Sequence, residues 1–208
     1  MQNWEKIFEE KISSVATADD PAHDLSHFKR VVKLAKEICE CENGDLNIVI
    51  PAAWLHDLII VPKNSPLRSQ ASKLSGEAAS VFLKSINYPE KYLKEIEYAI
   101  AGHSFSANLK TETLESKIVQ DADRLDGLGA IGTARCFATA GLLKRAFYSE
   151  ADPFCTERKP DDLIYTVDHF YKKLFLVADN LKTESGRKIG MARVQYMKDF
   201  LSQLKSEI

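Results

Sequence analysis

The sequence contains no long hydrophobic run. None of its segments approaches the roughly 20 consecutive apolar residues that a membrane-spanning helix needs, and residues 1–6 lack the layout of a signal peptide. We therefore expect a soluble, cytoplasmic protein with no membrane partner.

An excess of basic residues is also missing. The chain has 28 Lys and Arg against 30 Asp and Glu, which gives a formal net charge of −2. Proteins that bind the phosphate backbone of nucleic acids usually carry a clear positive excess. This composition argues against a nucleic-acid partner, although a small local cluster of cations is compatible with it.

Cysteine is scarce and is not arranged in CxxC pairs. The four residues Cys39, Cys41, Cys136 and Cys155 are therefore expected to be free thiols in a reducing compartment. Cys39 and Cys41 form a C-x-C that could bind a soft metal, but the chain offers no second pair at a useful spacing.

The chain lacks both a linker rich in Pro, Gly or Ser and a convincing alternating strand. We therefore predict one all-α domain over residues 1–208. The segment from Asn47 to Leu58, with Pro51 in its first turn, is apolar nearly all round, which predicts a helix buried on most sides at the centre of the fold. Helical spacing of apolar residues predicts helices at about 3–15, 24–42, 47–58, 75–86, 90–103, 114–125, 163–178 and 186–204.

Three connecting segments carry further expectations. Residues 61–68 hold two prolines and form a loop that leaves the central helix. Residues 127–135 are rich in small residues and match GxGxxG, but no strand precedes them, so we expect a close approach of helices or a ligand rather than a dinucleotide site. The polar loop 149–162 is long enough for a lid or a dimer contact, and a homodimer is compatible with the sequence.

His56 and Asp57 stand at the end of the apolar run that starts at Ile48. Adjacent residues on a helix point about 100° apart. Both can therefore touch one metal ion only if it lies in the groove beside the helix, with neighbouring helices supplying further ligands. His27 and Asp123, on an earlier and a later helix, complete the order H, HD, D.

Four stretches around these residues resemble the HD-domain metal-dependent phosphohydrolases, in particular a group of small stand-alone bacterial members: residues 23–31, 53–57, 103–106 and 117–125. The resemblance covers nearly the whole chain. It implies an HD-type helical bundle with a metal-ligand core at about 23–126 and C-terminal helices at 127–208. It also implies that His27, His56, Asp57 and Asp123 are the metal ligands.

A set of two imidazoles and two carboxylates suits manganese, iron, cobalt, nickel or zinc better than an all-oxygen magnesium site. We expect one divalent ion, with Mn²⁺ first and Mg²⁺ as a further alternative. Dinuclear relatives have two more histidines between the HD pair and the final Asp. Here only His103 lies in that interval, and residues 74–76 read Leu-Ser-Gly. The missing second histidine favours hydrolysis at a single metal ion. It argues against the reaction of the di-iron oxygenases, which are dinuclear HD proteins.

Catalytic roles are expected for Asp57, His103 and Glu77, because His and Glu can orient water or protonate a leaving group. Glu77 could instead stabilise the first turn of its helix. Asp121 and Asp126 share a predicted helix with Asp123, and a solvent-exposed acidic face of that helix would account for them without a role in the site.

Cations near the ion would neutralise substrate charge, and Lys63, Arg68 and Arg124 are the candidates for substrate binding; each could also be a solvated surface charge. His23 is expected to support the start of its helix or the surroundings of the ligand set rather than to bind the metal. Asp24 either caps the helix or holds the tautomer of His27, and the sequence leaves both alternatives open.

The resemblance implies a small phosphorylated substrate, with nucleotides as the usual class. Two loop cations can neutralise more than one phosphate, which favours nucleoside triphosphates cleaved at an anhydride by a metal-activated water to release pyrophosphate or phosphate. A nucleoside monophosphatase and a guanosine tetraphosphate hydrolase are the alternatives. A non-catalytic nucleotide-binding module is the alternative of another class.

Overall fold

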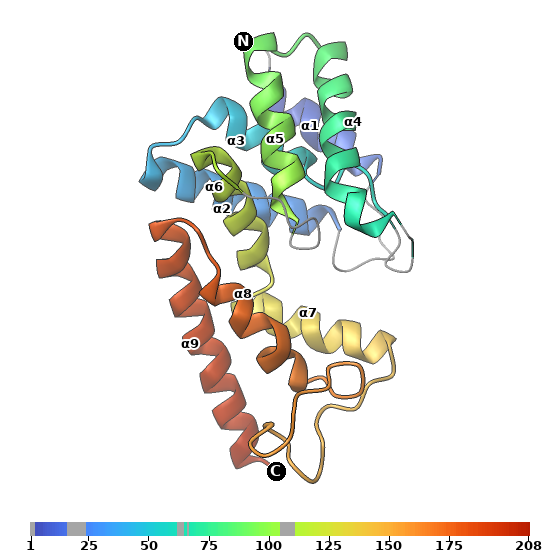
Figure 1. Ribbon diagram of the computed structural model, residues 1–208, viewed down its shortest axis with the longest axis vertical. Coiled ribbons are helices and arrows are strands. Elements are labelled where there is room, and N and C mark those ends of the chain that lie inside the picture. The colour runs from blue at the N-terminus through green and yellow to red at the C-terminus, as the bar shows by residue number, and fades with distance from the viewer. Residues whose placement is uncertain (1–2, 16–23, 62–64, 66, 105–110) are drawn as a thin grey trace. The chain divides into compact units, whose positions relative to one another are not determined.

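The computed structural model describes residues 3–15, 24–61, 65, 67–104 and 111–208, with only the backbone of Arg68 (Figure 1). The predicted all-α class is confirmed: the described residues hold helices and one isolated parallel β-bridge, Ala146 to Tyr165. They form two compact units, Met1–Asp123 and Arg124–Ile208. The expectation of one domain over the whole chain stays a prediction.

The first unit is built around helix α3. This helix packs against α1, α2, α4 and α5, and seven of its ten residues are buried. The apolar character on all sides of the segment therefore predicted its central place correctly. The elements that begin in this unit are α1 (Trp4–Ser13), α2 (Leu25–Glu42), α3 (Leu46–Leu55), η1 (Arg68–Gln70), α4 (Ala71–Ser85), η2 (Glu90–Tyr92), α5 (Leu93–His103) and α6 (Leu114–Asp126).

Helix α3 contains Pro51 beyond its first turn, where the missing N–H leaves the carbonyl of Asn47, four residues earlier, without its usual helical donor. The buried hydroxyl of Tyr88 donates a hydrogen bond of 2.7 Å to this carbonyl. Burial raises the pKa of Tyr88 to about 12, so the phenol keeps its proton. A side chain from a later segment thus repairs the gap that the proline makes.

The central helix is shorter than predicted. It ends at Leu55 rather than at Leu58, and the HD pair follows it in a turn that the Leu58 N–H closes on the Leu55 carbonyl at 3.1 Å. The pair consequently stands at the end of the buried helix, where side chains of other helices can converge on it.

The second unit contains α7 (Gly129–Leu142), the π-helix η3 (Phe170–Leu174), α8 (Phe175–Asp179) and α9 (Glu184–Ser206), with α9 packed against α7 and α8. Helix α7 was not predicted, because its small residues carry little apolar periodicity. A close approach of helices is present here: a Cβ on Gly129, which begins α7 with φ +71°, would lie 3.1 Å from Cγ of Arg193 on α9. A Cβ on Gly132 would clash with the carbonyl of Gly127.

A buried carboxylate organises the loop of the second unit. Asp168 is fully buried, and Arg158 donates to both of its oxygens, at 2.5 and 2.7 Å. The predicted helix at 163–178 therefore starts later, because its first residues are engaged in this loop and in the bridge at Tyr165. In the same segment, His169 Nδ1 lies 2.9 Å from Asp162 Oδ2.

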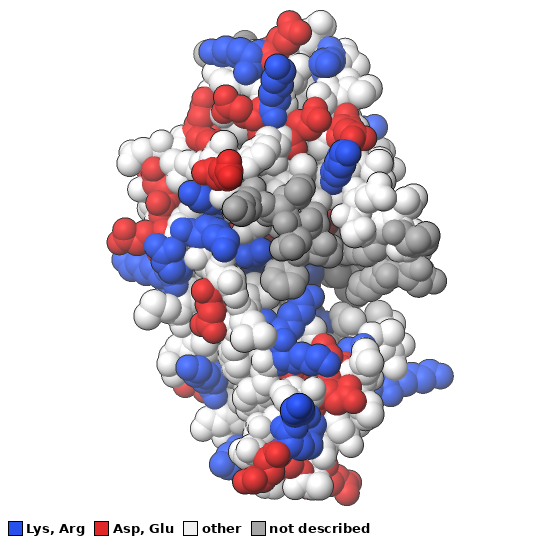
Figure 2. Space-filling model, viewed as in Figure 1, with Lys and Arg blue, Asp and Glu red and all other residues white. Residues whose placement is uncertain are grey.

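Charges of both signs are interspersed over the face of each unit that Figure 2 shows, as the small net charge leads one to expect. In the described part of the chain, no helix has the length and apolar character that crossing a bilayer requires.

Tyr88→Phe should lower the free energy of unfolding by about 1–3 kcal/mol, because it leaves the Asn47 carbonyl buried without a donor. Urea denaturation measures this, and Tyr92→Phe in the same region should change stability by less than about 0.5 kcal/mol. In a Pro51→Ala background the loss should shrink, since the restored N–H of residue 51 can bond to Asn47. An equal loss in both backgrounds would contradict the repair.

Asp168→Asn should destabilise the protein by about 2 kcal/mol or more at pH 7. Burial alone would raise the pKa of Asp168, but the hydrogen bonds from Arg158 outweigh it and hold this pKa below its usual range. The carboxylate therefore contributes stability that is present above the unfolded pKa of about 3.9 and is lost as the pH falls through the lower folded value. The Asn variant should lose less stability between pH 6 and pH 3 than wild type. Asp179→Asn, an exposed control, should leave the wild-type pH profile intact.

Candidate metal centre

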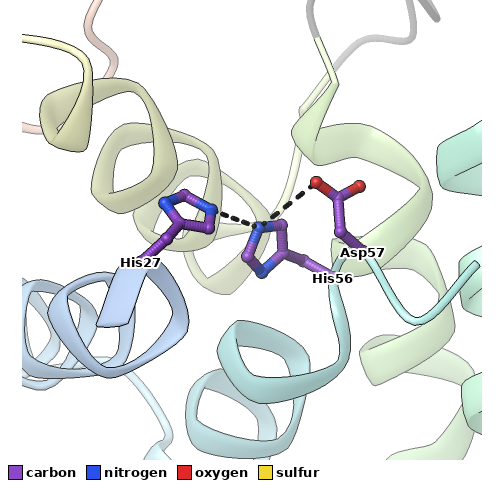
Figure 3. A group of neighbouring side chains, drawn as sticks. All are labelled: His27, His56 and Asp57. Atoms are coloured by element: carbon purple, nitrogen blue, oxygen red, sulfur yellow. Dashed lines mark hydrogen bonds and ion pairs between the residues drawn. The ribbon is translucent and has the colours of Figure 1, made fainter. Parts of the chain in front are cut away.

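Two buried imidazoles and a carboxylate converge at the end of α3 (Figure 3). His27 comes from the first turn of α2, and His56 and Asp57 follow α3. The Nε2 atoms of His27 and His56 are 3.3 Å apart, and Asp57 Oδ2 lies 3.7 Å from His56 Nε2. One ligand atom from each of the three lies within 4.8 Å of the others.

Asp123, on α6, approaches both imidazoles. Its Oδ1 lies 3.7 Å from His27 Nε2 and 3.8 Å from His56 Nε2. It stands outside the tightest group of three, and its side chain is 27% exposed where the imidazoles are at most 2% exposed. The four residues expected as ligands thus come together from α2, from the turn after α3 and from α6, within the first unit.

Local structure fixes the start of α2 near His27 and orients the imidazole of His56. The Asp24 carboxylate accepts a hydrogen bond of 2.8 Å from the backbone N–H of His27, so Asp24 caps α2. His56 Nδ1 donates to the carbonyl of Ala53 at 2.9 Å, which leaves Nε2 as the basic atom that faces the cluster. Burial lowers the pKa of His56 to about 4, so this ring is neutral at pH 7, the form that binds metal.

His103 forms the next wall of the site. Its Nε2 lies 3.5 Å from Asp57 Oδ1, and its ring is 4.9 Å from that of His56. Burial would lower the pKa of His103, but the hydrogen bond and charge of Asp57 outweigh it and raise this pKa to about 9. Asp57 therefore stands between a neutral imidazole and a protonated one.

The donor set fits a divalent ion. Bonds of about 2.0–2.2 Å from nitrogen or oxygen to a metal bring neighbouring ligand atoms roughly 3–3.5 Å apart. The facing Nε2 atoms of His27 and His56 have this spacing, and the carboxylates are a few tenths of an ångström farther away. Without a cation, the two facing Nε2 atoms need a proton between them.

Comparison with known proteins identifies the family. The model of the HD domain matches residues 24–128, which include the whole cluster. The chain belongs to the HD-domain family. HD domains are metal-dependent, and the cluster of His27, His56 and Asp57 could hold the ion.

Several relatives match this HD-domain chain over nearly its full length. The uncharacterized protein YpgQ of Bacillus subtilis (strain 168) is 31% identical over 201 residues, which cover 95% of this chain and 90% of YpgQ. A crystal structure of Bacillus subtilis YpgQ in complex with ADP has a TM-score of 0.74 at 30% identity and covers 98% of this chain and 97% of its own. An HD-superfamily hydrolase from Bacillus thuringiensis has a TM-score of 0.77 at 30% identity, with 99% and 97% covered.

Of the other expected site residues, the structure describes the side chains of only some. His23, Lys63 and the side chain of Arg68 lie outside the described residues. Glu77 is in the second turn of α4, not the first, and its carboxylate is 53% exposed, 3.9 Å from Lys73. Arg124 Nη1 donates to the carbonyl of Asn180 at 3.1 Å, which ties this cation to its own unit. The roles proposed for these residues stay predictions.

The expectation that Asp121 and Asp126 form a solvated acidic face is wrong. Both are buried, and Asp126 forms an ion pair of 2.5 Å with Arg135. A charge pattern along a helix does not show which face meets water when helices pack on more than one side. Gln120, a buried residue one turn before Asp123, was not predicted as a site residue, because a single Gln carries no motif signal.

Protein purified without chelator should contain about one divalent ion per chain by elemental analysis. His56→Ala and Asp123→Ala should lose most of it, because each removes a ligand atom from the cluster. His103→Ala should retain the ion if the site is mononuclear, and His169→Gln is a control outside the cluster.

In wild type, Mn²⁺ at 100 times its Kd should stabilise the fold by about 2.7 kcal/mol. Near-stoichiometric metal in both ligand variants would contradict the assignment.

Proposed function

We propose that this HD-domain protein is a divalent-metal-dependent phosphohydrolase that acts on nucleotides, with nucleoside triphosphates as the preferred class. The observation that carries the proposal is the convergence of His27, His56, Asp57 and Asp123 on one point. The relative YpgQ was crystallised in complex with ADP, which supports a nucleotide as the ligand.

The chemistry follows from the roles of the residues. The two imidazoles and two carboxylates would hold one ion, with Mn²⁺ first among the candidates. A bound divalent ion lowers the pKa of water and polarises a phosphoryl oxygen. Four protein ligands leave room for both water and substrate around an ion that accepts six.

His103 would act as the proton donor in the reaction. Its raised pKa means that it carries a proton at neutral pH, and Asp57 Oδ1 keeps its Nε2 directed at the cluster. It can therefore give a proton to a leaving oxygen or stabilise the charge that develops there. Asp57 would act both as a ligand and as the group that aligns His103.

The preference for triphosphates rests on cations. Lys63 and Arg68 follow the HD pair on one segment, and two positive charges can neutralise the β- and γ-phosphates. Cleavage of an anhydride would then release pyrophosphate or phosphate. A monophosphate would need only the metal and one cation, so a monophosphatase and a guanosine tetraphosphate hydrolase remain the alternatives.

A screen of phosphorylated metabolites with Mn²⁺ tests the activity. We expect hydrolysis of nucleoside triphosphates, with the products separated as pyrophosphate and phosphate, and a fall of kcat/KM by 100-fold or more in Asp123→Ala. His169→Gln should retain wild-type rates. Tight nucleotide binding without hydrolysis of any compound would instead establish a binding module and refute the enzyme.

The substrate class has its own test. Lys63→Ala and Arg68→Ala should each lower kcat/KM for triphosphates by about tenfold, because each removes a charge-assisted contact to phosphate. The effect on monophosphates should be smaller. Unchanged triphosphate kinetics, together with faster hydrolysis of monophosphates by wild type, would show that the enzyme is a monophosphatase.

A further inference from the structure

The C-terminal end of α5 is held by three side chains. The last carbonyls of a helix have no partner within it. Here His103 Nδ1 donates to the carbonyl of Ile100 at 2.7 Å, and Ser72 Oγ donates to that of Ala101 at 2.9 Å. Gln120 Nε2 donates to that of Gly102 at 2.8 Å.

These three donors come from three helices and are buried. Ser72 belongs to α4, His103 to α5 itself and Gln120 to α6, and each is at most 4% exposed. Gln120 lies three residues before Asp123, on the same side of α6. It therefore links the helical turn that carries a proposed metal ligand to the turn that carries His103.

The side-chain amide of Gln120 leaves one of its two polar atoms without a hydrogen-bond partner among the described residues. This atom is Oε1, which is buried. Turning the amide over would bring Oε1 against the Gly102 carbonyl, so the hydrogen bond to Gly102 determines its orientation. An apolar side chain of similar length would avoid the unpaired oxygen but would leave the Gly102 carbonyl without this donor, so the hydrogen bond to Gly102 is what the glutamine adds at this position.

The consequence of the link is geometric. His103 is the last residue of α5, and its Nε2 must stay near Asp57 Oδ1, now 3.5 Å away. Its backbone follows Gly102 directly, so a shift at the Gly102 carbonyl moves the base of the imidazole. Displacements on the order of 1 Å can cost about 100-fold in rate when a group acts in the reaction.

We propose that Gln120 is a positioning residue: by bonding the Gly102 carbonyl it fixes the end of α5 to α6, and so holds His103 in register with Asp57 and Asp123. The kinetic part of this proposal rests on the proposed phosphohydrolase function. The geometric part does not.

Gln120→Met keeps the length of the side chain and removes the donor. With ATP and Mn²⁺, or the triphosphate hydrolysed fastest in the screen, kcat should fall about tenfold or more. KM and the Kd for Mn²⁺ should change less than about threefold, because the ligand atoms remain. Gln120→Leu, which also removes the donor without adding a charge, should behave in the same way and serves if the Met variant does not fold.

A double-mutant cycle separates positioning from a general loss of structure. In a His103→Ala background, the Gln120 variant should cause no further fall in kcat, because the group that it positions is already missing. A structural role would lower kcat by the same factor in both backgrounds. Tyr88→Phe, which removes a buried side-chain donor to a carbonyl elsewhere in the unit, should lower stability without changing kcat.

A measurement without turnover completes the test. The ¹⁵N signals of the His103 ring in metal-free protein should shift in Gln120→Met and stay unchanged in Tyr88→Phe. Unshifted signals, or equal kinetic losses in both backgrounds, would overturn the proposal. If wild type hydrolyses none of the compounds, the proposed function fails, and the ring signals alone decide whether Gln120 positions His103.

Discussion

The structure of the first unit depends on one electrostatic constraint: two imidazole nitrogens and two carboxylates face a single point inside a helical core. Their Nε2 atoms are 3.3 Å apart and almost without access to water. Such an arrangement is favourable only when a cation or a proton compensates it. Of the two imidazoles, that of His56 is directed at the centre by the hydrogen bond that its other nitrogen, Nδ1, donates to the Ala53 carbonyl.

The surround of the cluster is made largely of backbone carbonyls at helix ends. His56 is oriented by the carbonyl of Ala53, and His103 by that of Ile100. A helix end supplies such acceptors because its last carbonyls have no partner within the helix, and its partial negative charge favours a protonated imidazole. The same need for partners explains Tyr88, which compensates for a proline in the central helix. The geometry of the cluster and the stability of the unit thus both depend on one kind of interaction.

The sequence predicted the structure best where apolar residues or motif residues form a recognisable pattern. It predicted the structure least well where the outcome depends on a contact between particular residues. The buried α3 and the order H, HD, D followed from apolar periodicity and a motif. Helix α7 was missed, because its glycines and alanines lack an apolar stripe while still allowing close packing at Gly132. Asp126 looked like a solvated charge, but its ion pair with Arg135 joins residues nine positions apart, and no periodicity predicts such a partner.

The sequence by itself determined the all-α class, the HD family and the residues that could bind a metal, since these depend on residue types and their order along the chain. Only the tertiary structure decided that Asp24 caps α2 while Asp57 contacts His103, and that Gln120 joins the turn of Asp123 to the end of α5. The physical reason is that hydrogen bonds and burial are pairwise properties of groups brought together by folding. A residue's chemistry can be read from the chain, but its partner is set by the packing of helices.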